Sequence, residues 1–206
     1  MLRKHRKIRS WLTFAVALLW SCSLQAQEVA LKTNLLYDGL TTPNLGLEVG
    51  LGCRMTAQLF YGLNPWVYSG SHSEARKVKH WVLMPELRWW GCTRMNGWFV
   101  GVHLMGGQFN AARVDLPLPG AFFSGLDVAK AVRDTRVEGS FAGAGLAVGY
   151  QWILSRHWNL EVETGVGYNR VWYDQFPCAE CGTKLDSGTS NYAGLTKLGV
   201  TLMYVF

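Results

Sequence analysis

Hydrophobic residues alternate with polar residues or glycine over most of the chain after residue 30. The alternation has a period of two, which is the pattern of β-strands with one apolar face. It recurs in segments that lie within residues 31–37, 44–51, 55–64, 80–89, 98–105, 142–152, 158–169 and 191–206. Because the segments follow one another through connections that suit hairpins, we predict an all-β chain of eight antiparallel strands.

The two faces of these strands differ in a way that indicates what surrounds them. One face is aliphatic, with aromatic residues near its ends, and the other carries glycine, amides and charges of both signs. A soluble barrel keeps its apolar face inside. Here the long uncharged apolar faces favour the reverse arrangement, with lipid outside and small or paired polar groups inside. Eight strands enclose an interior that side chains just fill. We therefore predict an eight-stranded transmembrane β-barrel of the outer-membrane type.

Aromatic residues lie where such a barrel would meet the two edges of a bilayer. The expected girdle residues are Tyr37, Trp81, Trp89, Trp98, Trp152, Trp158, Tyr168 and Tyr204. Pro85 interrupts one predicted strand, so we expect a bulge or a local break there. The last strand ends in Leu202, Tyr204 and Phe206, which resembles the signal that the barrel-insertion machinery of outer membranes recognises.

The predicted connections alternate in length. Short turns near 52–54, 92–97 and 154–157 alternate with longer segments at 38–43, 67–78, 110–137 and 174–191. Outer-membrane barrels place short turns in the periplasm and longer loops outside. The aromatic residues expected on the loop side are Trp66, Tyr68, Phe109, Phe122, Phe123, Trp172 and Phe176. They are candidates for a partner interface, and an extended girdle or simple loop packing explains them equally well.

The N-terminus has the order of a secretory signal peptide. Five basic residues precede an apolar run from Trp11 to about Leu24, and Ala26 is a suitable last residue before cleavage. We predict a signal peptide over 1–26 and the barrel over 27–206; a retained anchor helix and a lipid-modified Cys22 are the alternatives. Removing 1–26 leaves 15 basic and 14 acidic residues. This balance gives no support to a nucleic-acid partner. The signal peptide and the predicted barrel together place the protein in the outer membrane of a Gram-negative bacterium, in contact with lipid and lipopolysaccharide.

Seven charged residues fall on the predicted inward faces. They are Lys32, Glu48, Glu86, Arg88, Glu161, Glu163 and Lys197. An unpaired charge in a narrow interior costs several kcal/mol, so we expect these four acids and three bases to pair into a network that plugs the barrel. The alternative is an ion path or gate.

The cysteines and histidines suggest other chemistry. In an oxidising location, Cys178 and Cys181 favour a local disulfide, whereas Cys53 and Cys92, in neighbouring turns, either form a disulfide or stay as free thiols. A CxxC pair without further ligands predicts no metal site, and no cofactor motif is present. His80 and His103, with loop serines and Glu86, leave open a lipid A-modifying enzyme.

Several blocks resemble one family. They are ALKTNLLYDGLTTPNLGLEVGLG (30–52), YGLNPW (61–66), KHWVLMPELRWW (79–90), GWFVGVHLMGGQFN (97–110), AGAGLAVGYQWILSRHWNLEVETGVGY (142–168) and NYAGLTKLGV (191–200). Together they are similar to the DUF3575 family of Bacteroidetes outer-membrane proteins. The resemblance implies an eight-stranded outer-membrane barrel, no known activity, and an association with surface fimbrial proteins. We therefore expect a non-enzymatic barrel that supports or binds a cell-surface structure, such as one in fimbrial biogenesis; a lipid A-modifying enzyme, and a passive barrel or small pore, are the alternatives.

Overall fold

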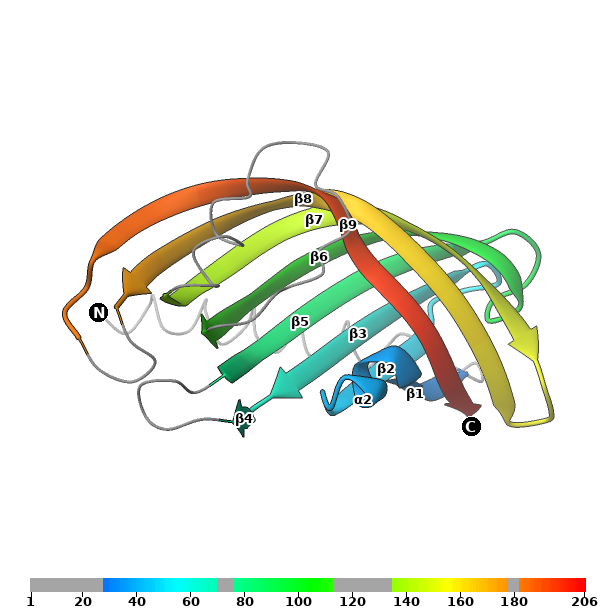
Figure 1. The fold of residues 1–206 in the computed structure, drawn as a ribbon. Coiled ribbons are helices and arrows are strands. Elements are labelled where there is room, and N and C mark those ends of the chain that lie inside the picture. The colour runs from blue at the N-terminus through cyan, green and yellow to red at the C-terminus, as the bar shows by residue number, and fades with distance from the viewer. Residues whose placement is uncertain (1–27, 70–75, 113–134, 178–181) are drawn as a thin grey trace, which may run out of the picture.

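The computed structural model describes residues 28–69, 76–112, 135–177 and 182–206, and its fold is almost entirely β-structure (Figure 1). The strands are β1 (Val29–Asn34), β2 (Asn44–Gly50), β3 (Met55–Asn64), β4 (Val67–Ser69), β5 (Arg76–Trp90), β6 (Gly97–Ala112), β7 (Arg136–Ile153), β8 (Trp158–Phe176) and β9 (Asp186–Val205). One short helix, α2 (Leu35–Gly39), follows β1. Within the described residues, no helix combines the length and the hydropathy that a membrane crossing requires.

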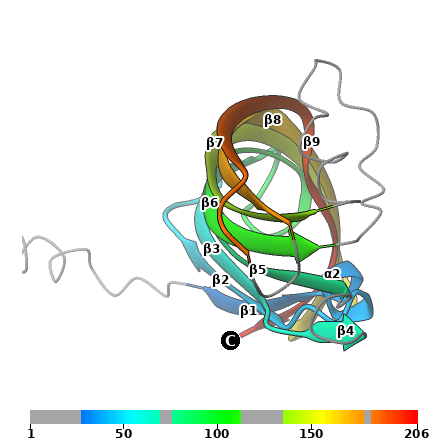
Figure 2. The same cartoon turned by 60° about the vertical axis from the view of Figure 1, so that its left-hand side comes forward.

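Eight of the strands form a closed ring of antiparallel pairs (Figure 2). Each strand pairs with its neighbour in the chain, with one exception. β3 pairs with β5, because the short β4 pairs only with the first residues of β5. The ring closes between the first and last strands, where Ala30 is opposite Val205. This confirms the prediction of an all-β chain with eight antiparallel strands. The predicted signal peptide, 1–26, lies outside the described residues.

The strands differ greatly in length, so only part of the sheet belongs to the closed ring. β1 and β2 have six and seven residues, whereas β7, β8 and β9 have 18, 19 and 20. In Figure 1, β5 to β9 continue well past β1 and β2 as a curved sheet. We call this part the extension; it comprises residues 76–81, 107–112, 136–141, 170–176 and 186–192. Much of what the sequence predicted as long loops is therefore strand.

The first strand is shorter than predicted, because the chain turns into α2 at Leu35. Asn34 caps this helix, and its side chain accepts a hydrogen bond from the backbone nitrogen of Leu36 at 3.1 Å. The turn sends Tyr37 into the interior, where its ring packs edge-on against Phe60 with centroids 5.3 Å apart. The prediction that Tyr37 belongs to an aromatic girdle is therefore wrong.

The irregularity expected at Pro85 is smaller than predicted, and a second one lies elsewhere. Pairing of β5 with β6 skips Met84 and Pro85, yet the register is the same on both sides, so there is no bulge. The register shift occurs in β9, where Gly165 pairs with Lys197 but Val166 pairs with Leu195. Thr196 is the extra residue. This bulge reverses which positions of β9 face inward. Odd-numbered positions face inward on the C-terminal side of the bulge, and even-numbered positions face inward on its N-terminal side.

Candidate functional site

The outer face of the ring is apolar on every strand. Aliphatic side chains with 38–63% of their surface exposed point away from the interior, and one from each strand is enough to trace the belt: Leu31, Leu47, Leu59, Leu87, Val102, Leu146, Val166 and Leu198. Tryptophans gather at the short-turn end of this belt, at positions 89, 98, 152 and 158. A continuous exposed apolar surface of this extent marks a face that is covered by something other than water.

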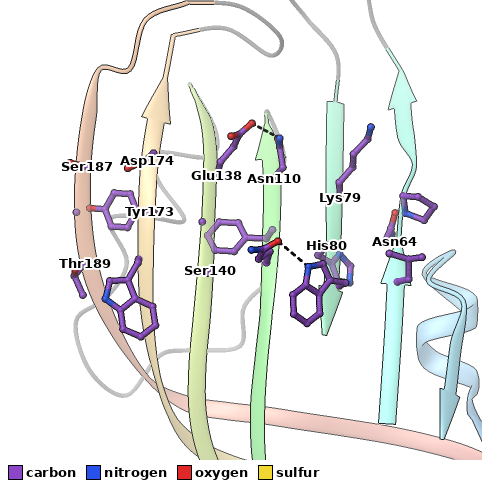
Figure 3. Close-up of a pocket in the computed structure, with 18 residues that line it drawn as sticks. Asn64, Lys79, His80, Asn110, Glu138, Ser140, Tyr173, Asp174, Ser187 and Thr189 are labelled. Carbon is purple, nitrogen blue, oxygen red and sulfur yellow. Dashed lines mark hydrogen bonds between the residues drawn. The ribbon is translucent and has the colours of Figure 1, made fainter. Parts of the chain in front are cut away.

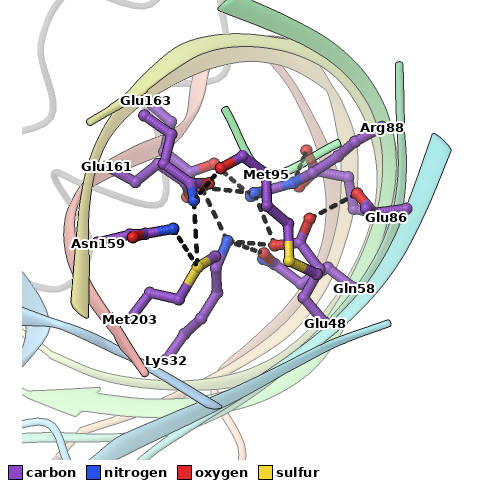
Figure 4. A network of polar contacts seen from close by, with 12 residues as sticks. Lys32, Glu48, Gln58, Glu86, Arg88, Met95, Asn159, Glu161, Glu163 and Met203 are labelled. Atoms are coloured by element: carbon purple, nitrogen blue, oxygen red, sulfur yellow. Dashed lines mark hydrogen bonds and ion pairs between the residues drawn. The ribbon is translucent and has the colours of Figure 1, made fainter. Parts of the chain in front are cut away.

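The interior of the ring holds the seven charged residues predicted to face inward, and they lie together (Figure 4). Each has 8% or less of its surface exposed. Arg88 is the centre of the cluster: its Nε lies 3.0 Å from Glu86, its Nη1 lies 3.2 Å from Glu48 and 2.8 Å from Glu161, and its Nη2 lies 2.8 Å from Glu163. One planar guanidinium thus joins carboxylates from two other strands, β2 and β8, to the one on its own strand.

Two lysines complete this network from opposite sides. Lys32 on β1 lies 2.5 Å from Glu48 and 2.8 Å from Glu161. Lys197 on β9 pairs with Glu86 and, at 2.8 Å, with Glu163. The charge network therefore contains three cations and four carboxylates, and each carboxylate contacts two of the cations. Buried charges are tolerated when they are paired in this way.

Neutral residues extend the charge network, and among them the sequence analysis named only His103. Gln58 accepts a hydrogen bond from Lys32 at 2.9 Å, and Thr56 donates one to Glu48 at 2.5 Å. The indole of Trp90 donates to Thr56 at 2.9 Å. His103 is fully buried and lies 3.0 Å from the hydroxyl of Thr196 in the β9 bulge. Thr56, Gln58 and His103 all stand on the polar faces of predicted strands, so their position was available from the alternation, but their partners were not.

Apolar clusters lie on both sides of the charge network along the strands. Toward the short turns, the cluster consists of Ala30, Trp90, Met95, Phe99 and Met203. Toward the extension, it consists of Phe60, Val82 and Met84, with Tyr37, Met105 and Phe141 packed against them. The ring of Phe99 also lies 4.4 Å from the Arg88 guanidinium carbon. Side chains thus fill the ring interior through its described length.

The extension encloses a cup of about 960 Å³ at the end away from the short turns (Figure 3). Its floor is a single row of register partners across six strands: Asn64, His80, Phe109, Gly139, Tyr173 and Gly188. The flanking residues that also border the cup have the opposite alternation, so their side chains point to the outer face.

Two aromatic rings lie across glycines in this row. A side chain added at Gly139 would meet the ring of Phe109 at 2.9 Å, and one added at Gly188 would meet the ring tip of Tyr173 at 2.7 Å. Each ring therefore lies against the backbone of the next strand, in space that only glycine leaves open. Neither ring is fully buried. The glycines thus leave room for the two rings on the floor of the cup.

The polar groups of the cup are neutral. His80 lies with its Nδ1 3.2 Å from the carbonyl oxygen of Val78, which makes Nδ1 the donor and leaves Nε2 as an acceptor. Burial lowers the pKa of His80, and the hydrogen bond to Val78 partly opposes that shift, so the imidazole is neutral at pH 7. Asn64, at one end of the floor row, is buried and donates to Thr42 at 3.1 Å.

The outer face of the extension is polar, in contrast to the belt. Asn110 donates a hydrogen bond to Glu138 at 2.5 Å, and the indole of Trp81 donates one to Gln108 at 3.1 Å. Asp174 pairs with Lys184 at 2.7 Å near the end of β8. Within single strands, the polar and apolar faces therefore exchange sides between the ring and the extension.

The structure separates the aromatic residues expected on the loop side. Phe109 faces the cup, whereas Trp172 lies on the outer face with the Arg170 guanidinium carbon 5.6 Å from its ring centroid. Phe176 has Arg136 at 4.3 Å in the same arrangement. Trp66 is exposed and donates from its indole to the carbonyl of Thr41 at 2.8 Å. Tyr68 lies in β4, but its side chain, like Phe122 and Phe123, lies outside the described residues.

The structure describes one of the two cysteine pairs that the sequence singled out. Cys53 and Cys92 are exposed free thiols, and it is Arg94 whose backbone nitrogen donates to the Cys53 carbonyl at 3.0 Å. Cys178 and Cys181 lie outside the described residues.

The three residues of the predicted insertion signal all point to the outer face of the ring. Leu202 and Tyr204 are half-buried and Phe206 is exposed. The ring of Tyr204 contacts those of Trp158 and Phe206, with centroids 5.1 Å apart in both pairs.

No group of histidine, cysteine and carboxylate residues that could hold a metal ion occurs in the described part of the chain. No curated protein matches the sequence. A family model described as a protein of unknown function does match, and it covers residues 12–206, which include every strand of the ring. The chain therefore belongs to the DUF3575 family.

Proposed function

We propose that this protein is a transmembrane β-barrel of the outer membrane, closed to ions, which supports or binds a structure at the cell surface and has no catalytic activity of its own. The observation that carries the proposal is the exchange of polarity along β6 to β9. In the ring, the outward side chains are apolar and the charged residues face inward, whereas in the extension most outward side chains are polar. A strand that passes from lipid into water requires this exchange.

The height of the belt fits this proposal. On β8, the outward-facing residues from Trp158 to Tyr168 are exposed aromatic or aliphatic side chains, Leu160 and Thr164 aside, and charged Arg170 follows. A segment of about 9–11 tilted residues crosses the hydrocarbon core of a bilayer. The aromatic residues at its two ends match the interfacial preference of tryptophan and tyrosine.

The ring interior supports a barrel that does not conduct. The seven residues of the charge network are buried and paired, and apolar clusters flank them on both sides. An ion that entered would have to break pairs among charges that have no access to water, which costs several kcal/mol. We therefore propose a structural role for the charge network.

The role at the cell surface rests on the extension. A barrel that served only as an anchor needs no strands beyond the bilayer. Here β5 to β9 all continue past the apolar belt and enclose the cup. Surface fimbrial proteins are the partners that we propose first.

Three measurements test the membrane proposal. Purified protein refolded into lipid vesicles should migrate as a compact band on gels without boiling, and planar bilayers that contain it should show no conductance steps. In intact cells, a maleimide that does not cross membranes should label Ser187→Cys in a chain whose Cys53, Cys92, Cys178 and Cys181 are all replaced by serine. It should not label Cys53 or Cys92 in a Cys178→Ser/Cys181→Ser chain. Labelling of the two turn cysteines with none at position 187 would reverse the orientation. A protein that stays soluble without detergent would end the proposal.

A further inference from the structure

The side chains that line the cup limit the chemical class of ligand that it can bind. The side chains on its floor are two aromatic rings, an imidazole, a phenol hydroxyl and a buried amide, and none of them carries a charge. The charged residues at its border, Lys79, Glu138 and Asp174, point to the outer face by alternation. Glu138 and Asp174 are engaged there with Asn110 and Lys184.

This lining excludes the charged classes of ligand. A phosphate or carboxylate needs a cation or a set of backbone N–H groups, and a metal or amine needs carboxylates. The floor of the cup offers neither. A purely apolar ligand is equally unsuited, because it would bury the Tyr173 hydroxyl and the His80 Nε2, which have no hydrogen-bond partner among the described residues.

The remaining class is a neutral molecule with both apolar faces and hydroxyl groups. A pyranose ring is such a molecule, because its axial C–H bonds form an apolar face that stacks on an aromatic ring while its hydroxyls donate and accept around the edge. Phe109 and Tyr173 supply two aromatic rings on the same register row, and the tips of these rings lie over Gly139 and Gly188. His80 and the Tyr173 hydroxyl supply an acceptor and a donor beside them.

We propose that the cup binds a neutral glycan segment, with Phe109 and Tyr173 as stacking platforms and His80 as a hydrogen-bond acceptor. A volume of about 960 Å³ accommodates a few sugar residues and leaves the cup open for a longer chain to pass. The proposal goes beyond the proposed function and depends on it only for the side of the membrane that the cup faces.

The test uses the full mature chain in an amine-oxide detergent, because glycoside detergents would compete for the cup. The probes are neutral hexasaccharides of α-glucose, β-glucose and mannose, with inorganic phosphate and a sialylated oligosaccharide as charged controls. We expect saturation-transfer NMR and calorimetry to detect binding of at least one neutral probe. Tyr173→Ala and Phe109→Ala should each weaken it by about tenfold, the size of effect typical of an aromatic anchor.

Trp172→Ala is the matched control, since it removes an aromatic residue one position away on the opposite face of β8, and it should change affinity less than twofold. Gly188→Ala gives an independent variant that keeps every aromatic residue, because the atoms nearest the new methyl group all belong to the Tyr173 ring, which it would displace. It should weaken binding as Tyr173→Ala does. Each variant must first show the compact band of the folded protein.

The outcomes are separable. Tighter binding of phosphate or the sialylated probe, no binding of any neutral probe at about 10 mM, or equal losses in Trp172→Ala and Tyr173→Ala would overturn the proposal.

Lipopolysaccharide with and without its polysaccharide chain distinguishes the source of the sugar. Dependence of binding on the chain indicates a glycan of the cell's own surface, while free-hexasaccharide binding alone indicates a glycan from elsewhere. Binding to lipopolysaccharide regardless of the chain, with no hexasaccharide binding, also overturns it. None of these results depends on whether the ring crosses a membrane.

Discussion

The ring and the extension are built from the same strands, yet their faces have opposite polarity. In the ring, Leu146 and Val166 point outward while Glu161 and Glu163 point inward. Ten residues further along β8, Tyr173 points inward and Asp174 outward. Alternation alone therefore does not tell which face of a strand is buried. The medium outside the sheet decides it, and on our proposal that medium changes from lipid to water near Tyr168.

The two regions also differ in how they fill space. In the ring, charges and apolar clusters pack the interior until no side chain of the charge network has more than 8% exposure. In the extension, Ala111 and Val137 are buried with Phe109 and Tyr173 packed against them, but the cup beside these two rings stays open. We therefore expect substitutions of the same chemical type to lower the stability of the protein more in the ring than in the extension.

The largest difference is expected for arginine. Arg88→Met removes the guanidinium that four carboxylates share and leaves them buried, so it should destabilise the protein by about 3–5 kcal/mol. Arg170→Met, an exposed change in the extension, should cost less than about 0.5 kcal/mol. Urea titration of the compact gel band in vesicles measures both. A cost below about 1 kcal/mol for Arg88→Met would show that the charge network does not hold the ring together.

A smaller difference is expected for glycine. At Gly167 in the ring, an added methyl group would meet the backbone of Ala144 and Gly145, which cannot move aside, so Gly167→Ala should cost about 1–3 kcal/mol. At Gly188 it would meet only the movable end of Tyr173, so Gly188→Ala should cost well under 1 kcal/mol. Thermal melts followed by the same gel assay decide the order. Equal losses would mean that the extension is packed as tightly as the ring.

The smallest effect is expected for the outer ion pair of the extension. Asp174 and Lys184 are each close to half exposed, and exposed pairs contribute about 0–1 kcal/mol. Asp174→Asn should therefore leave the urea midpoint unchanged at 0.5 M salt and lower it slightly, if at all, at low salt. Glu161→Gln, its counterpart in the charge network, should lower the midpoint at both salt concentrations, because screening does not reach a buried pair.

The sequence predicted the ring well because its alternation is regular. The phase of each strand placed Lys32, Arg88 and Lys197 on the inward faces, and the structure brings them together with their acidic partners. The phase could not show that Arg88 would be the centre, since which strands adjoin across a closed ring depends on register and shear. Thr56 and Gln58 were likewise on the expected face but without visible partners.

The sequence predicted the extension poorly, for a physical reason. We looked for an apolar outward face, which residues 136–141 and 170–176 lack. Residues 136–137 and 174–176 were therefore included in predicted loops, and 138–141 and 170–173 in no predicted strand. Tyr37 was misplaced because the Asn34 cap starts a helix of only five residues, too short to show a helical period. The β9 bulge at Thr196 left no mark either, because one inserted residue among small and polar neighbours looks like ordinary alternation.

The pairing of β1 with β9 has a consequence for how the chain reaches its folded form. Ala30 meets Val205, so the contact that closes the sheet joins its first strand to its last, at nearly the greatest separation the chain permits. Contacts of this kind form late and slowly. Until the last strand has been made, the partly formed sheet has two unsatisfied edges and a greasy convex surface, which makes it prone to aggregate. Its biogenesis should therefore require an escort that shields the unfinished chain from synthesis to closure.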